Sequence, residues 1–217
     1  MTDRTPDTDR AGEAELFWED HYSSQERVWK GNPNPVLVES AQALTPGIAL
    51  DLGCGEGGDA LWLATHGWRV TAVDVSATAL RRTAAHAAAA RAGDLITTEQ
   101  HDLARSFPAG TFDLVSAQYL HTPLEFPRAR VFQQAAHALT AGGLLLIVDH
   151  GSVRPWAWNP DPDTNFPTPE DVFSDLELDP GRWRAERLDR PWRQATGPHG
   201  QTAAVTDNVI AIRRRTA

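Results

Sequence analysis

Short apolar runs alternate with helical patterns through most of the chain. Runs that end at polar residues predict strands, whereas apolar residues three to four positions apart predict helices. The predicted strands are 49–51, 68–74, a segment ending before Asp102, 112–118, 144–149, 182–188 and 207–213. The predicted helices are part of 15–29, then 36–44, a helix after the glycines near residue 55, 76–91, 131–139 and 168–176. This alternation predicts an α/β fold, with a mostly parallel sheet and helices on both faces.

Four glycines follow the first predicted strand closely, at positions 53, 55, 57 and 58. Glycines allow a tight turn and a close approach of the backbone to a ligand, and the helix that follows offers free N–H groups. The turn is therefore suited to a nucleotide-like cofactor. Its spacing satisfies both the dinucleotide pattern Gly-x-Gly-x-x-Gly and a second pattern, Asp-x-Gly-x-Gly-x-Gly, which begins at Asp51.

Asp51 separates these two interpretations. A carboxylate at the mouth of the turn repels a pyrophosphate, but it suits the cationic amino group of a methionine moiety. Together with Gly53, Cys54, Gly55 and Gly57 it resembles the motif of class I S-adenosylmethionine (SAM) methyltransferases. The expected cofactor is thus SAM, with S-adenosylhomocysteine (SAH) as its product. The alternatives are a turn or capping role for Asp51 and a nicotinamide cofactor in the turn.

Asp74 ends the second predicted strand, and Val75 follows it. An acid at this place accepts hydrogen bonds from ribose hydroxyls in SAM and NAD enzymes alike. It supports an adenosine cofactor without choosing between them. Ser76 is the predicted N-cap of the next helix, and the alternative for Asp74 is that it only caps that helix.

The resemblance to methyltransferases implies further cofactor contacts. Asp102 would bond the adenine amino group, and the backbone of Leu103 would meet a ring nitrogen, unless Asp102 is only a polar turn residue. Gln118 ends the fourth strand, where open α/β sheets bind their ligands. The resemblance also implies a Rossmann-like seven-stranded sheet whose last strand, 207–213, is antiparallel. Residues 139–149 would form a helix end, a glycine turn and the fifth strand.

The N-terminal part carries a narrower resemblance. Residues 17–22 and 28–35 resemble the entry segment of TehB-like and thiopurine-type methyltransferases, in which an aromatic residue helps to cover the two ligands. Those relatives methylate soft nucleophiles such as thiols and tellurium or selenium oxyanions. Trp29 is expected to contact the cofactor through a cation–π interaction. The alternative is that Trp18 and Trp29 only pack a helix onto the domain.

Tyr22, His121 and His150 are the candidates for catalysis. The two histidines follow the fourth and fifth strands, so either is a candidate base for a hydroxyl acceptor, with a structural role as the alternative. Arg154 is expected near the same pocket. Trp156 and Trp158 would form an aromatic lid or a packed surface insert within a proline-rich loop, 154–169.

The composition argues against several classes of function and partner. The net charge of −9 argues against a nucleic-acid partner. No apolar run reaches the ~18 residues of a membrane span. The single cysteine excludes an internal disulfide and predicts a cytoplasmic protein, and no Cys/His grouping has zinc spacing, so no metal is expected. Lys30 is the only lysine, which excludes a Tyr-x-x-x-Lys dehydrogenase pair and a lysine phosphate loop.

These observations predict one domain over 1–217, with an N-terminal helical segment (1–45), a SAM-binding core (46–150) and a substrate-side loop with final strands (151–217). We expect a SAM-dependent methyltransferase, monomeric or homodimeric, that acts on a small molecule, a thiol or chalcogen before other acceptors. The main alternative is O- or N-methylation of an aromatic or quinol-type metabolite. Remote alternatives are a non-catalytic SAM-binding protein and an NAD(P)-dependent oxidoreductase.

Overall fold

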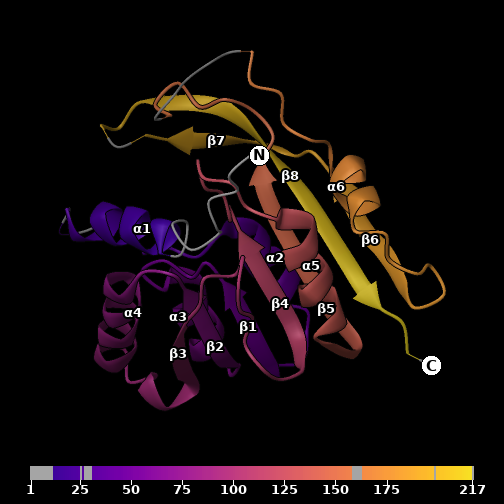
Figure 1. Cartoon of the computed structure of the whole chain (residues 1–217), viewed down its shortest axis with the longest axis horizontal. Helices are drawn as coiled ribbons and strands as arrows, with labels where there is room; N and C mark the ends of the chain where they lie inside the picture. Colours follow the sequence, from indigo (N-terminus) through magenta and orange to yellow (C-terminus); the bar gives the residue numbers. More distant parts are fainter. Residues whose placement is uncertain (1–11, 25, 27–30, 158–162, 198, 217) are drawn as a thin grey trace, which may run out of the picture.

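The computed structural model describes residues 12–24, 26, 31–157, 163–197 and 199–216, and it contains one mixed sheet flanked by helices (Figure 1). The strands are β1 (Ile48–Leu52), β2 (Arg69–Asp74), β3 (Ile96–Gln100), β4 (Phe112–Gln118), β5 (Leu139–His150), β6 (Trp183–Asp189), β7 (Trp192–Thr196) and β8 (Thr202–Arg214). The helices are α1 (Glu13–Ser23), α2 (Pro35–Ala41), α3 (Gly58–Thr65), α4 (Ala77–Ala89), the 3-10 turn η1 (Gly93–Leu95), α5 (Arg128–His137) and α6 (Pro169–Asp175).

The strand order is β3-β2-β1-β4-β5-β8-β6, and β7 pairs with β8 beside this path. Strands β1 to β5 pair in parallel, and β8 runs antiparallel to both β5 and β6. The predicted Rossmann-like sheet with an antiparallel last strand is therefore confirmed. The sheet has eight strands where seven were predicted, and β7 is the additional one. Strand β8 begins five residues before the predicted 207–213.

The core has two halves, one on each face of the sheet. Successive residues of a strand point to opposite faces, so Leu144 and Leu146 of β5 pack with α2 and α3, whereas Leu145 and Ile147 pack with α5. Both faces of the central strands are buried, which explains why these strands appear in the sequence as nearly continuous apolar runs.

Capping side chains fix where several helices begin. The Ser76 hydroxyl accepts a hydrogen bond from the backbone N–H of Ala79 at the start of α4, as predicted. Thr168 and Asp171 form a capping box at α6. One prediction was wrong in detail: residues 139–143 are not a helix end and a separate turn. Strand β5 already begins at Leu139, which pairs with Phe112, and a register shift before Leu114 absorbs the glycines.

The elements that could cover a ligand lie on the side of the sheet where the parallel strands end. Figure 1 shows α1 on this side and the β7–β8 hairpin reaching over it from the other end of the sheet. Among the described residues, no helix is both long and apolar enough to cross a bilayer.

Candidate cofactor and acceptor site

A large cavity of about 1760 Å³ opens at the carboxyl ends of the parallel strands. Residues of α1, the loop 31–35, the ends of β1, β2, β4 and β5, and β7 line it. Most of the residues predicted from the sequence lie on its wall: Tyr22, Gly53, Cys54, Gly55, Asp74, Val75, Asp102, Leu103, Gln118, His121 and His150. The fold thus brings side chains that are far apart in the sequence around one space.

Two of the predicted cofactor-binding residues do not line this cavity. Asp51 is buried at the end of β1, with 2% of its surface exposed. Gly57 lines a smaller cavity of about 340 Å³ instead. It is the N-cap of α3 at φ +81°, and a Cβ there would lie 2.6 Å from a Thr83 carbon, so the glycine serves the packing of α3 against α4. Trp29 lies outside the described residues.

The glycine turn has the open geometry that the sequence predicted. Gly53 and Gly55 adopt φ angles of +70° and +55°, in the left-handed region that favours glycine. The Gly55 N–H donates a hydrogen bond to Asp74 Oδ2 over 2.9 Å. A Cβ on Gly53 would lie 2.6 Å from Leu120 Cδ1, so β1 and the segment after β4 approach each other here without room for a side chain. Burial raises the pKa of the Cys54 thiol, which therefore stays protonated.

Among the described residues, the buried carboxylates around this turn outnumber the cations paired with them. Asp51 Oδ2 has no hydrogen-bond partner in the part of the chain that the structure describes. Burial, and then the carboxylates of Asp59 and Asp74, raise the pKa of Asp51 well above its ordinary value. Burial also raises the pKa of Asp59 to about 6 and raises that of Asp74. A bound cation would relieve this repulsion.

The polar atoms along the same wall match the other parts of an adenosine-containing cofactor. Asp74 accepts backbone hydrogen bonds from Gly55 and Ser76 through its two oxygens and still borders the cavity. Gln118 Oε1 is buried with no partner among the described residues. Asp102 accepts from the Ala104 N–H at 3.0 Å, so it also has the local turn contact that the alternative interpretation requires. These acceptor groups fit SAM. The free Oδ2 of the Asp51 carboxylate suits its ammonium group, and the other oxygens can accept hydrogen bonds from its hydroxyl and amino groups.

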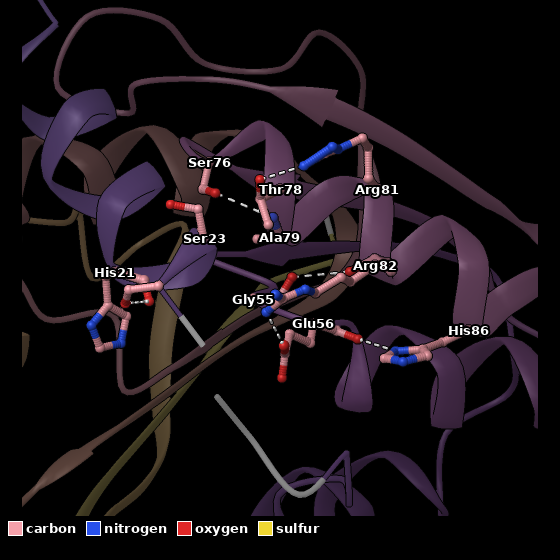
Figure 2. Close-up of polar contacts among 12 residues, drawn as sticks. His21, Ser23, Gly55, Glu56, Ser76, Thr78, Ala79, Arg81, Arg82 and His86 are labelled. Atoms are coloured by element: carbon pink, nitrogen blue, oxygen red, sulfur yellow. Dashed lines mark hydrogen bonds and ion pairs between the residues drawn. The ribbon is translucent and has the colours of Figure 1, made fainter. Parts of the chain in front are cut away.

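Contacts from α4 and α1 hold the turn from behind. Arg82 of α4 pairs with the buried Glu56 carboxylate at 2.7 Å, and His86 Nδ1 lies 2.9 Å from the Glu56 carbonyl oxygen (Figure 2). Glu19 of α1 accepts hydrogen bonds from the Thr78 hydroxyl, the Thr78 N–H and the Ser76 hydroxyl at the start of α4. These bonds lower the pKa of Glu19 to about 2. The sequence analysis missed Glu19, because only the packing of two helices reveals its partners.

The two candidate histidines lie together at the opposite end of the cavity. His150 stacks between Tyr119 and His121, with ring centroids 4.4 Å and 5.2 Å apart. Arg128 Nη1 donates to His121 Nδ1 over 3.1 Å, so a neutral His121 carries its proton on Nε2, which lies 3.4 Å from Asp149 without a hydrogen bond. Burial, with Arg128 and Arg154 adding to it, lowers the pKa of His121. Burial and Arg154 lower the pKa of His150 to about 3.

Two further residues of this end, Arg193 and Asp207, were not identified from the sequence. Arg193 of β7 bonds both oxygens of Asp207, at 2.5 Å and 3.2 Å, and donates to the Tyr119 hydroxyl at 2.9 Å. Asp207 is 2% exposed. The only signal in the sequence was an acid, Asp207, at the start of an apolar strand. Its partner Arg193 lies on β7, which was not predicted. Burial and Asp207 raise the pKa of Tyr119 to about 12.

The remaining predictions concern the loop after β5. Arg154 lines the cavity, as expected. Trp156 does not; its ring lies against Gly197, where a Cβ would approach it to 2.8 Å. Trp158 falls outside the described part of the chain. Within the described residues, no cluster of three or more His, Cys, Asp or Glu side chains is placed to hold a metal ion.

Comparisons with known proteins agree with this geometry. Residues 49–143 match a family model described as a methyltransferase domain. A curated relative, the ribosomal RNA small subunit methyltransferase C of Alcanivorax borkumensis, is 57% identical over 35 residues. That segment is 16% of this chain and only 11% of the relative, so the match spans a small part of that protein.

Solved structures match over nearly the whole chain. The protein studied for the conversion of a disulfide bond into a thioacetal group during echinomycin biosynthesis is 26% identical, with 93% of each chain covered and a TM-score of 0.72. TehB from Haemophilus influenzae is 18% identical, with 91% of this chain and 67% of TehB covered and a TM-score of 0.67. The N-methyltransferase NodS from Bradyrhizobium japonicum, solved with SAH, is also 18% identical, with 94% and 100% covered and a TM-score of 0.65.

The glycine turn beside the buried carboxylates, the strand order and the matching family model all point to the same kind of domain and cofactor. Residues 49–143 carry a methyltransferase domain, and SAM is the cofactor that the site fits.

Proposed function

We propose that this methyltransferase acts on a small molecule whose nucleophile is soft, a thiol or a chalcogen anion. The observation that carries the proposal is the state of the ionisable groups at the acceptor end of the cavity. The His121 lone pair is engaged by Arg128, the pKa of His150 is about 3, and that of Tyr119 is about 12. None of these three groups is a good proton acceptor near neutral pH.

A nucleophile that ionises readily needs no such base. A free thiol has a pKa of about 8.5 and is more easily ionised than an alcohol or a simple phenol. The neighbouring Arg154 guanidinium favours the anion further. When bound, SAM supplies an activated methyl group whose leaving group is a neutral thioether. The protein's contribution is then to hold the acceptor in line and to exclude water, which can account for a large part of the rate.

The size and the relatives support a small acceptor. Ligand pockets for single small molecules measure roughly 300–1,000 Å³, and the cavity of about 1760 Å³ has room for a cofactor and a small acceptor together. The structure solved for thioacetal formation concerns sulfur chemistry, and the proposal extends that chemistry to this chain. We further propose a single-domain cytoplasmic protein, monomeric or homodimeric, with no nucleic-acid partner, consistent with the net charge of −9 and the single cysteine.

One observation favours a second candidate function. The His150 ring borders the cavity, and no hydrogen bond to another described residue occupies it. A phenol, quinol or amine that raised the pKa of His150 on binding would gain a base there, which corresponds to O- or N-methylation.

Release of SAH from SAM decides between these functions. The purified protein is incubated with separate thiols, selenite, tellurite, phenols, quinols and heteroaromatic amines. Turnover confined to the thiols and chalcogen anions, with kcat retained in His150→Gln even where KM rises, is the expected result. Turnover of phenols or amines that is lost in His150→Gln would replace the first proposal with the second. SAH binding without turnover of any acceptor would count against both.

A further inference from the structure

Three arginines lie at the acceptor end: Arg154 and Arg193 line the cavity, and Arg128, outside its lining, contacts His121. Two of the three have acidic partners. Arg193 bonds both oxygens of Asp207, and Arg128 bonds Asp149 at 2.5 Å. Both acids are almost fully buried. Each pair is therefore locally neutral, and neither guanidinium offers an uncompensated charge to a ligand.

Arg154 differs from them. It is partly buried and lines the cavity, but its guanidinium makes no hydrogen bond or ion pair within the part of the chain that the structure describes. The nearby Asp207 is already shared with Arg193. Glu125, which also lines the cavity after β4, is engaged in an interaction of its own. Burial and the neighbouring Arg193 lower the pKa of the Arg154 guanidinium.

A partly buried cation without a partner is unfavourable, because it has lost hydration and gained nothing in return. Proteins keep such groups where a ligand brings the opposite charge. The neighbours of Arg154 show what else that ligand would meet. The stacked rings of Tyr119 and His150 form a flat wall beside it, on the same cavity.

We propose that Arg154 determines acceptor specificity by pairing with a carboxylate or oxyanion on the acceptor, whose body lies along the Tyr119–His150 wall. The planar guanidinium fork matches a carboxylate with two parallel hydrogen bonds, which fixes orientation as well as charge. The proposal rests on the proposed function, because it assigns the substrate class of that site: a small anionic acceptor. It excludes neutral thiols and amines as the preferred substrates.

A matched pair of acceptors tests the idea through turnover. The probes are 4-mercaptobenzoate and 4-mercaptobenzamide, which differ in charge but hardly in shape. The wild-type protein should prefer the acid. Arg154→Gln should raise KM for the acid by about tenfold or more, the range for losing a charged hydrogen bond, and leave KM for the amide and the Kd for SAM unchanged. Arg69→Gln is the control, because Arg69 is exposed at the opposite, amino end of β2.

A binding experiment keeps this test separate from the proposed function. Benzoate and benzamide are titrated into the SAH-saturated wild-type, Arg154→Gln and Arg154→Lys proteins, whose folding is checked by thermal melts. Tighter binding of benzoate that is lost in Arg154→Gln and partly kept in Arg154→Lys supports the anion site even if no thiol is methylated. Selenite that displaces benzoate assigns the site to small oxyanions as well.

Two results would overturn the proposal. One is benzoate binding that does not distinguish wild-type from Arg154→Gln. The other is an Arg154→Gln protein that loses SAM affinity with benzoate binding intact, which would mean that the guanidinium holds the carboxylate of the cofactor.

Discussion

The two ends of the cavity have opposite electrostatics. At the end formed by β1 and β2, buried carboxylates repel one another, and the pKa values of Asp51, Asp59 and Asp74 are raised. At the end formed by β4, β5 and β7, arginines surround two histidines whose pKa values are lowered. Among the described residues, the first end has no cation paired with these acids, and the second has a guanidinium without an acid. Each end is complementary to a ligand charge, so the free protein holds unfavourable charges that binding would relieve.

The comparison is tested most strongly at Asp51. Asp51→Asn keeps the shape but removes the charge, so SAH affinity should fall by about 1–3 kcal/mol, the range for a charged hydrogen bond. Asp74→Ala should weaken binding by a similar amount. The free energy of unfolding of the ligand-free Asp51→Asn protein should not fall, because the substitution removes a buried charge that no described cation neutralises, and the amide oxygen can still accept from the Ala60 N–H. Calorimetric titration and urea unfolding measure both, with the exposed Asp94→Asn as control. Unchanged affinity in the folded variant would refute the assignment.

Asp207→Asn should have the opposite effect on stability. Here the acid neutralises Arg193, so its loss leaves a partly buried guanidinium without a partner. Breaking a fully buried pair costs about 3–5 kcal/mol. Arg193 is 34% exposed, so we expect the free energy of unfolding to fall by about 2 kcal/mol. The control is Asp189→Asn, which removes an exposed pair with Arg187. Equal stability of the two variants would argue against a paired acceptor end.

The pH dependence of SAH binding tests the acidic end of the cavity. An acid whose pKa is raised in the fold keeps its proton there longer than in the unfolded chain. Its contribution to stability is therefore lost as the pH rises from about 4 to the folded value, which is about 6 for Asp59. The ammonium group of SAH favours the ionised acids. The rise in Tm caused by SAH should hence be larger at pH 7 than at pH 5, and a rise that is flat or smaller at pH 7 would contradict the account.

Glu19→Gln should give the smallest effect. Its carboxylate caps α4 from α1, and replacing a charged cap by a neutral amide should reduce the free energy of unfolding by about 1 kcal/mol at pH 7. Because the pKa of Glu19 is lowered to about 2, the wild-type protein keeps this contribution above its ordinary pKa and loses it as the pH falls toward 2. Asp20→Asn, on the exposed face of the same helix, is the control in urea unfolding. Indistinguishable variants would mean that the cap does not stabilise the docking of α1.

The sheet could be predicted because its central strands are buried on both faces and so appear as apolar runs. Strand β7 could not, because Trp192–Thr196 is mostly exposed and only Ala195 is buried. The pairing of Arg193 with Asp207 was out of reach for the same reason, since it depends on the register between β7 and β8.

More of the cofactor end than of the acceptor end could be predicted from the sequence. The glycines and acids of the former lie in one turn and at the end of the next strand, where local spacing carries the chemistry. The acceptor end is assembled from β4, β5, β7 and the loop after β5. Local spacing also could not show that Gly57 packs against Thr83, which belongs to a different element, α4.

The most direct measurement is a calorimetric titration of the wild-type protein with SAH and, separately, with NAD⁺. The turn should bind SAH, whose ammonium group suits the Asp51 carboxylate, and give no heat with NAD⁺, because Asp51 repels its pyrophosphate. Binding of NAD⁺ without binding of SAH would contradict the assignment of the acidic end to SAM, and with it the account of the cavity.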